Sequence, residues 1–248
     1  MKVTGTLKNP PIKEAIIDIQ FDSESLDFEK LLSLIDIIPI SFEDPQLIRT
    51  QKVKLIINED GDNDIDQDNS EFVGYRWVST DGASVLQLKK NSITYSCLNS
   101  YKTWDEFKQQ AKLIWIALEI SNKVKRLNRL AVRYVNDIQI PLNNKGLELS
   151  DYFVNDPKTP EGMTDGISEF FSRVSIPYHE LKSKAIVVQA FNKFENDILS
   201  VILDIDIYSE EVKHFDDNEM WLFFDKLRVL KNIAFFGSIT QKTKELFE

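Results

Sequence analysis

Alternating apolar and polar residues mark the first regular stretch of the chain, AIIDIQF at residues 15–21. Its odd-numbered positions are apolar, whereas Asp18 and Gln20 take the opposite face. A period of two residues is typical of a strand with one buried face. Similar alternation, or a short apolar run, predicts strands at 51–58, 71–79, 84–90, 92–98, 130–141, 168–177, 184–191 and 199–208. The turn signal Asp81-Gly82 is short, so the strands that it joins are expected to be antiparallel neighbours.

Apolar residues at helical spacing predict two long helices and two short ones. The first long helix begins after Thr103, which forms a T-x-x-E capping box with Glu106. The second begins near Asn218, and we expect Gly237 to interrupt it before Ser238 starts a terminal turn. The predicted ranges are 26–38, 103–122, 147–154 and about 218 onward, with a loop at 156–166.

A second copy of the opening pattern, YVNDIQI, occurs at residues 134–140. Each half of the chain has the order strand, helix, antiparallel strands, long helix, so the echo indicates an internal duplication. The alternative is that two strands converged on the same pattern of buried and exposed positions. We therefore expect an α+β fold of two similar halves, 1–125 and 126–248, packed as one compact unit. This order resembles the duplicated TATA-binding-protein-like or helix-grip arrangement, which by itself assigns no function.

Four stretches also resemble a known family. They are NPPIKEAIIDIQF (9–21), RLAVRYVNDIQIP (129–141), LDIDIY (203–208) and FFGSITQKTKELF (235–247). In this order they resemble a sporadically distributed, uncharacterised bacterial family of similar length, with NPPI-x-EA, RYVN-x-I-x-IP and LDID motifs. The resemblance implies a bacterial, cytoplasmic protein and no particular activity. Sporadic distribution is typical of mobile defence or toxin–antitoxin genes.

Charge is concentrated in one part of the chain. The net charge is −10, and residues 59–71 contain seven acids and no Lys or Arg. This segment is interpreted as a solvated acidic loop; a calcium site in an EF-hand-like register would need Gly where Ile65 stands. A docking patch for a basic partner is a further alternative. Residues 123–133 are the most basic stretch, but the overall charge makes nucleic acid an unfavoured partner.

Other composition features bear on location and chemistry. No apolar run approaches the roughly 18–20 residues that span a bilayer, so no membrane contact is expected. The N-terminus has no apolar signal segment, and Cys97 is the single cysteine, which excludes an internal disulfide. Together these features predict a cytoplasmic protein.

Aspartates on predicted strand faces suggest a metal site. Asp204 and Asp206 share one face, about 7 Å apart along the strand. A third carboxylate from Asp18 or Asp137 would complete a set for a divalent metal, as in a metal-dependent phosphodiesterase or nuclease. The alternative is a solvated face with ion pairs to arginines on neighbouring strands, such as Arg133.

Four further residues are candidate contacts for a ligand or partner. Asn136 falls on the apolar face of its strand, where its amide either holds a backbone edge or meets a ligand. Arg133 is a candidate carboxylate or anion clamp, or one half of a cross-strand ion pair. Arg76 and Trp77, together with Tyr75, would suit a peptide or nucleobase if they surround an open sheet surface.

The leading function is therefore a non-catalytic binding protein with a protein partner, which the family resemblance suggests is a co-encoded defence or toxin-like effector. No nucleotide-binding glycine loop or histidine metal motif occurs in the sequence, so no cofactor is expected apart from the divalent metal considered above. A metal-dependent hydrolase and a small-ligand carrier with a cavity between sheet and helix remain alternatives, and homodimer formation stays open.

Overall fold

A computed structural model describes residues 7–23, 27–50, 53–57, 63–67, 70–118, 120, 124–142, 147–163, 166–211 and 216–248. For 53–57 and 63–67 it describes the backbone only. Much of the acidic segment 59–71 therefore lies outside the described residues.

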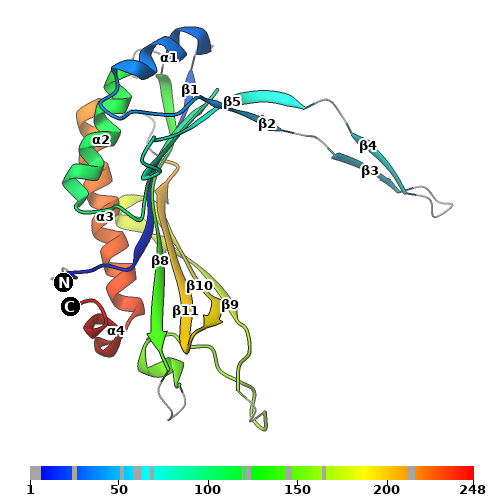
Figure 1. Ribbon diagram of the computed structural model, residues 1–248, viewed down its shortest axis with the longest axis vertical. Coiled ribbons are helices and arrows are strands. Elements are labelled where there is room, and N and C mark those ends of the chain that lie inside the picture. The colour runs from blue at the N-terminus through cyan, green and yellow to red at the C-terminus, as the bar shows by residue number, and fades with distance from the viewer. Residues whose placement is uncertain are drawn as a thin grey trace.

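Within the described residues, nine strands form one antiparallel sheet with the order β2-β5-β6-β7-β1-β8-β11-β10-β9. The strands are β1 (Ile12–Ser23), β2 (Gln46–Thr50), β5 (Glu71–Val78), β6 (Ser84–Lys89), β7 (Ser92–Leu98), β8 (Val124–Pro141), β9 (Phe171–Tyr178), β10 (Ser183–Glu195) and β11 (Ile198–Ser209). Among the described residues, β3 (Val53–Ile57) and β4 (Asn63–Gln67) pair only with each other, and they project beyond the β2–β5 edge as a hairpin (Figure 1). The fold is thus a mixed α and β structure built on one large open sheet.

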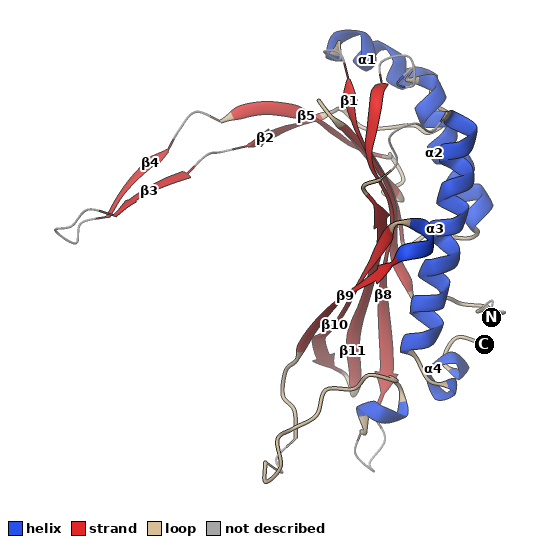
Figure 2. Cartoon of the chain, turned by 180° about the vertical axis from the view of Figure 1, so that it is seen from behind, coloured by secondary structure: helices blue, strands red, loops and turns tan. Residues whose placement is uncertain are grey.

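The helices lie on one face of this sheet. They are α1 (Phe28–Leu34), α2 (Trp104–Ala117), α3 (Asp217–Ser238) and α4 (Gln241–Glu245), with 3-10 turns at Ile35–Ile37, Leu149–Asp151 and His179–Leu181. Figure 2 shows α2 and α3 following the convex face of the curved sheet, while the concave face is not covered by a described helix. We call this uncovered side the open face.

The positions of the buried strand residues explain why the helices pack on that face of the sheet. The apolar positions of β1, from Ala15 to Phe21, are buried against them, and the Phe21 ring meets Trp115 of α2 edge-on at 6.1 Å. Two indole nitrogens then join the helices: Trp104 donates to Asp225 at 2.7 Å and Trp115 donates to Asp217 at 3.2 Å. Trp104 and Trp115 therefore each bury the indole ring and satisfy its N–H within the contact between the two helices.

The region from 46 to 78 differs from the sequence prediction. The expected strand at 51–58 corresponds to β3, whereas β2 was not predicted and β4 takes up residues 63–67 of the expected acidic loop. Polar residues such as Asn63 and Asp64 have low strand propensity, and the backbone of β4 is paired with β3. The pattern of apolar residues therefore could not reveal it.

Other boundaries shift for physical reasons. β8 begins at Val124, not near 130, because it pairs with β1 along its length, as in the pairs Asp22–Arg126 and Ser23–Val124. α3 continues through Gly237, since one glycine near a helix end costs only about 1 kcal/mol. The terminal helix is capped by Thr240, not by Ser238. The expected helix at 147–154 is a 3-10 turn, Leu149–Asp151.

Among the described residues, no helix is both long enough and apolar enough to cross a bilayer.

Candidate functional site

The open face carries a group of charged residues at the centre of the sheet. Strand register places Asp18 of β1, Arg129 and Arg133 of β8, and Asp204 and Asp206 of β11 on this face. We call these five residues the charged cluster. Alternation puts them opposite the helices, since their chain neighbours, such as Leu130 and Ile205, are buried in the core.

Arg129 holds the cluster together. Its two terminal nitrogens donate to different strands: Nη1 to Asp18 at 2.7 Å and Nη2 to Asp206 at 2.8 Å. The guanidinium also stacks on the Tyr208 ring, 4.5 Å from its centroid. Thr94 donates a further hydrogen bond to Asp18 at 2.7 Å. Because the planar guanidinium can donate in several directions at once, a single arginine connects β1, β8 and β11.

Arg133 forms a separate pair beside it. Its Nε and Nη2 donate to the two carboxylate oxygens of Asp204, at 2.8 and 2.5 Å. This bidentate geometry raises the pKa of the Arg133 guanidinium above its usual value. The Arg133 side chain stays half exposed, whereas Asp204 is largely covered. The sequence interpretation of Arg133 as one half of a cross-strand ion pair is therefore the arrangement observed.

Asp206 is the least satisfied member of the cluster. Burial raises the pKa of its carboxyl above the ordinary value, and the nearby Arg129 and Arg133 oppose that rise. One of its oxygens, Oδ1, is buried and has no hydrogen-bond partner among the described residues. Asp206 therefore holds an unsatisfied buried acceptor at the centre of the cluster.

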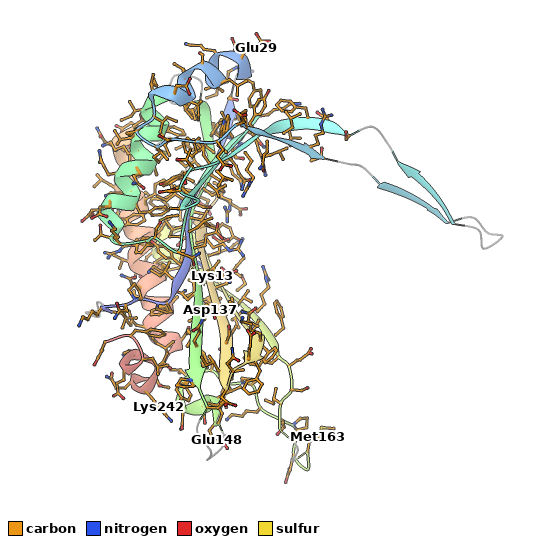
Figure 3. All side chains as sticks on the ribbon, viewed as in Figure 1. Lys13, Glu29, Asp137, Glu148, Met163 and Lys242 are labelled. Carbon is orange, nitrogen blue, oxygen red and sulfur yellow. The ribbon has the colours of Figure 1, made fainter. Side chains whose placement is uncertain are left out.

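The predicted metal residues are only partly brought together. Asp18, Asp204 and Asp206 meet in the cluster, but the Arg129 guanidinium lies between Asp18 and Asp206, where a cation would have to bind. Asp137 lies elsewhere on β8 (Figure 3), accepting a 2.5 Å hydrogen bond from Ser200. Within the described residues, no group of three or more metal-ligating side chains is positioned to hold an ion. This geometry favours ion pairing over metal binding.

Arg76 and Trp77 lie on opposite faces of the sheet. Arg76 is on the open face near the β2 edge, where it donates to Gln46 at 2.9 Å. Trp77 points to the helix side and is 1% exposed, so the expectation that it lines an open surface is wrong. Adjacent residues in a strand point to opposite sides, which makes a shared surface for the two side chains impossible.

Asn136 is buried on the helix side. Its amide nitrogen donates to the backbone oxygens of Leu203 at 2.9 Å and Tyr134 at 3.3 Å. Of the two interpretations of this residue, the structure thus supports the backbone staple, which ties β8 to β11.

Sequence reasoning missed Arg129 as the central residue. Residues 123–129 fell between the predicted helix at 103–122 and the predicted strand at 130–141, which left Arg129 outside the pattern. Extending the alternation of β8 backwards from Arg133 would have found it, because residues two and four positions apart share a face.

An apolar strip lies next to the charged cluster on the open face. Register places its members in rows beside Asp204 and Asp206, reaching the β9 edge; they are Val135, Ile186, Val188, Ala190, Ile202 and Phe171. All are at least partly exposed, and Phe171 is 70% exposed. The open face therefore combines an internally paired polar centre with an accessible apolar margin.

No protein-family model matches this chain, and no curated protein is similar to it in sequence.

Proposed function

We propose that this chain is a non-catalytic binding protein that receives a protein partner on its open face. The observation that carries the proposal is the apolar strip beside the charged cluster. A helix-free concave surface with exposed aliphatic and aromatic side chains loses free energy when another protein covers it. The ion pairs within the charged cluster let a partner cover the cluster without leaving its ions unpaired, and the half-exposed Arg133 offers a polar contact at the rim of the strip.

The strand order supports the duplicated architecture that we infer. Reading outward from the centre, one half is β1-β7-β6-β5 and the other is β8-β11-β10-β9, each followed in sequence by a long helix. Ala15 and Tyr134, which the two DIQ motifs align, are paired directly across β1 and β8. A local two-fold axis between these residues would relate the halves, as in TATA-binding-protein-like or helix-grip arrangements. The boundary expected at 125/126 then falls at the start of β8.

The partner is further proposed to be a co-encoded defence or toxin-like effector in the bacterial cytoplasm. This step depends on the family resemblance of the four sequence stretches, and the open face supplies the physical surface for it. An alternative docking element is the acidic β3–β4 hairpin, which would suit a basic partner.

Affinity capture from the native host tests the proposal. The wild-type chain is compared with Phe171→Asp, which places a charge on the apolar strip, and with Leu222→Asp. Leu222 is 62% exposed on α3 and makes a matched control for the same change on the helix side. We expect one protein to be recovered in stoichiometric amount with wild type and Leu222→Asp, and to be lost with Phe171→Asp. Recovery of the wild-type chain alone, or equal recovery with all three, would refute the proposal.

A further inference from the structure

A small cavity lies between the long helices and the sheet, on the side opposite the open face. Its volume is about 240 Å³. It is bordered by the first turn of α2, the C-terminal half of α3, Asn136 of β8 and the chain entering β1. Ligand sites for drug-sized molecules are usually larger, so a ligand of this cavity would be small.

Two cations line this cavity. Lys231 is 8% exposed, and its Nζ lies 4.0 Å from the centroid of the Tyr134 ring. Arg228 lies one turn earlier on α3. Its Nε is buried and donates no hydrogen bond to any described residue. In the described part of the chain neither side chain forms an ion pair, although Asp105 also borders the cavity. Lys231 is buried, whereas Arg228 is partly exposed with its Nε buried, so the cost of an unpaired cation falls mainly on Lys231, and a bound anion would remove that cost.

Other donors face the same space. Tyr134 donates its hydroxyl hydrogen to the Tyr101 hydroxyl at 3.3 Å, which leaves the Tyr101 hydrogen available to a ligand. Thr103 and Trp104 begin α2, a 14-residue helix whose first N–H groups have no intrahelical acceptor. The positive end of the helix dipole therefore adds to the field of the two side-chain cations.

The rest of the lining is mixed. Leu7, Pro10, Ile12, Phe235 and Phe236 form apolar walls, while Lys102, Asp105, Asn136 and Asn232 add polar groups. A bare inorganic ion would leave these walls uncovered, whereas an organic anion with a ring or short chain would fill them.

We propose that this cavity binds a small organic carboxylate, with its anionic group between Lys231 and Arg228 and its apolar body against Phe235 and Phe236. This site is separate from the open face and does not depend on the proposed protein partner. It makes the chain a receptor for a metabolite-sized acid as well as an interaction module.

The protonation of Lys231 links this site to pH. Burial, followed by the charge of Arg228, lowers the pKa of Lys231 to about 7. The other charged or titratable groups around it are Tyr134 on β8, Tyr101 before α2, and Lys102 and Asp105 at the α2 start; burial raises the pKa of both tyrosines. A carboxylate favours the charged lysine, so binding takes up a proton near neutral pH and weakens as pH rises from 7 to 9.

Benzoate is the probe, with benzamide as its neutral isostere and inorganic phosphate as a tetrahedral anion. Lys231→Met removes the buried charge at similar volume. Lys226→Met is the matched control, because Lys226 is exposed on the same helix. For a Kd of about 1 mM, benzoate at about 10 mM should raise the melting temperature of wild type and Lys226→Met by about 3 °C.

Benzamide should give no shift, and Lys231→Met should not respond to benzoate. Calorimetry of the wild-type chain in buffers of different ionisation enthalpy should show proton uptake at pH 7.5. The proposal is overturned if benzoate leaves wild type unchanged, if it stabilises Lys231→Met equally, or if phosphate binds in its place.

Discussion

Arg129 contacts two carboxylates on different strands, and the stability of the charged cluster depends on it. Replacing it by leucine would leave Asp18 and Asp206 partly buried without their shared cation. We expect Arg129→Leu to lower the free energy of unfolding by about 2–3 kcal/mol in urea titrations, because uncompensated buried charges are costly. Arg133→Leu should cost less, about 1–2 kcal/mol, since it leaves one largely covered carboxylate, that of Asp204, without its cation instead of two. Equal losses for the two variants would contradict the central role of Arg129.

Lys231 should make stability depend on pH in a defined direction. Its pKa is about 7 in the folded chain, below its ordinary value of 10.5. Between these values the unfolded chain binds a proton that the folded chain does not, so the free energy of unfolding rises with pH. The slope approaches about 1.4 kcal/mol per pH unit at most. Without added ligand, urea titrations at pH 6 to 9 should show this rise for wild type.

The variant Lys231→Met isolates that contribution. It should be more stable than wild type at pH 6, where the native lysine is charged in an apolar setting, and its advantage should shrink as pH increases. Parallel curves for the two proteins across this range would show that Lys231 does not titrate as described.

At the scale of single elements, the helix starts offer a direct comparison. α3 begins with a complete capping box: Asp216 accepts from the Glu219 N–H at 2.9 Å, and the Glu219 side chain accepts from the Asp216 N–H at 3.1 Å. Asp216→Ala should cost about 1 kcal/mol of unfolding free energy. Asp216→Asn keeps an acceptor and should cost much less, measured by thermal unfolding. A similar loss for both would assign the effect to charge rather than to capping.

The elements also differ in how far the sequence predicted them. β1, β6, β7, β10, β11 and the two long helices were found, because each has one buried face that imposes a clear period. β2 and β4 were not predicted, since β2 has little buried surface and β4 is rich in polar residues. The Arg133–Asp204 pair was anticipated from alternation, while Arg129 required the correct start of β8.

Lys231 shows a different limit of prediction from the sequence. Lys231 stands four residues after Leu227 and four before Phe235, so its place in the apolar stripe of α3 was visible in the sequence. What the stripe did not reveal was that Lys231 lies over the Tyr134 ring, or that no acid forms an ion pair with it in the described residues. These depend on how α2, α3 and β8 meet, which no local pattern encodes.

For the whole molecule, the β3–β4 hairpin can be separated from the sheet. Thr50 and Glu71 are paired across β2 and β5, so a two-residue Asn-Gly turn can replace residues 51–70. We expect the free energy of unfolding to be unchanged or slightly raised, because β3 and β4 pair only with each other. A loss of more than about 2 kcal/mol in denaturant titrations would mean that the hairpin supports the sheet. If capture of the partner also fails, the acidic hairpin is its docking element.

The central pairing of β1 with β8 has a consequence for the order in which the protein forms. β1 lies between β7 and β8, and β8 begins about a hundred residues after β1 ends. During synthesis, β1 can pair with β7 before β8 has been made. The other edge of β1 keeps unpaired backbone groups until β8 leaves the ribosome. At about 5–20 residues per second this delay lasts several seconds. For that time the nascent chain therefore exposes an unpaired strand edge that can pair with other chains. A chaperone that binds extended segments would act in this interval.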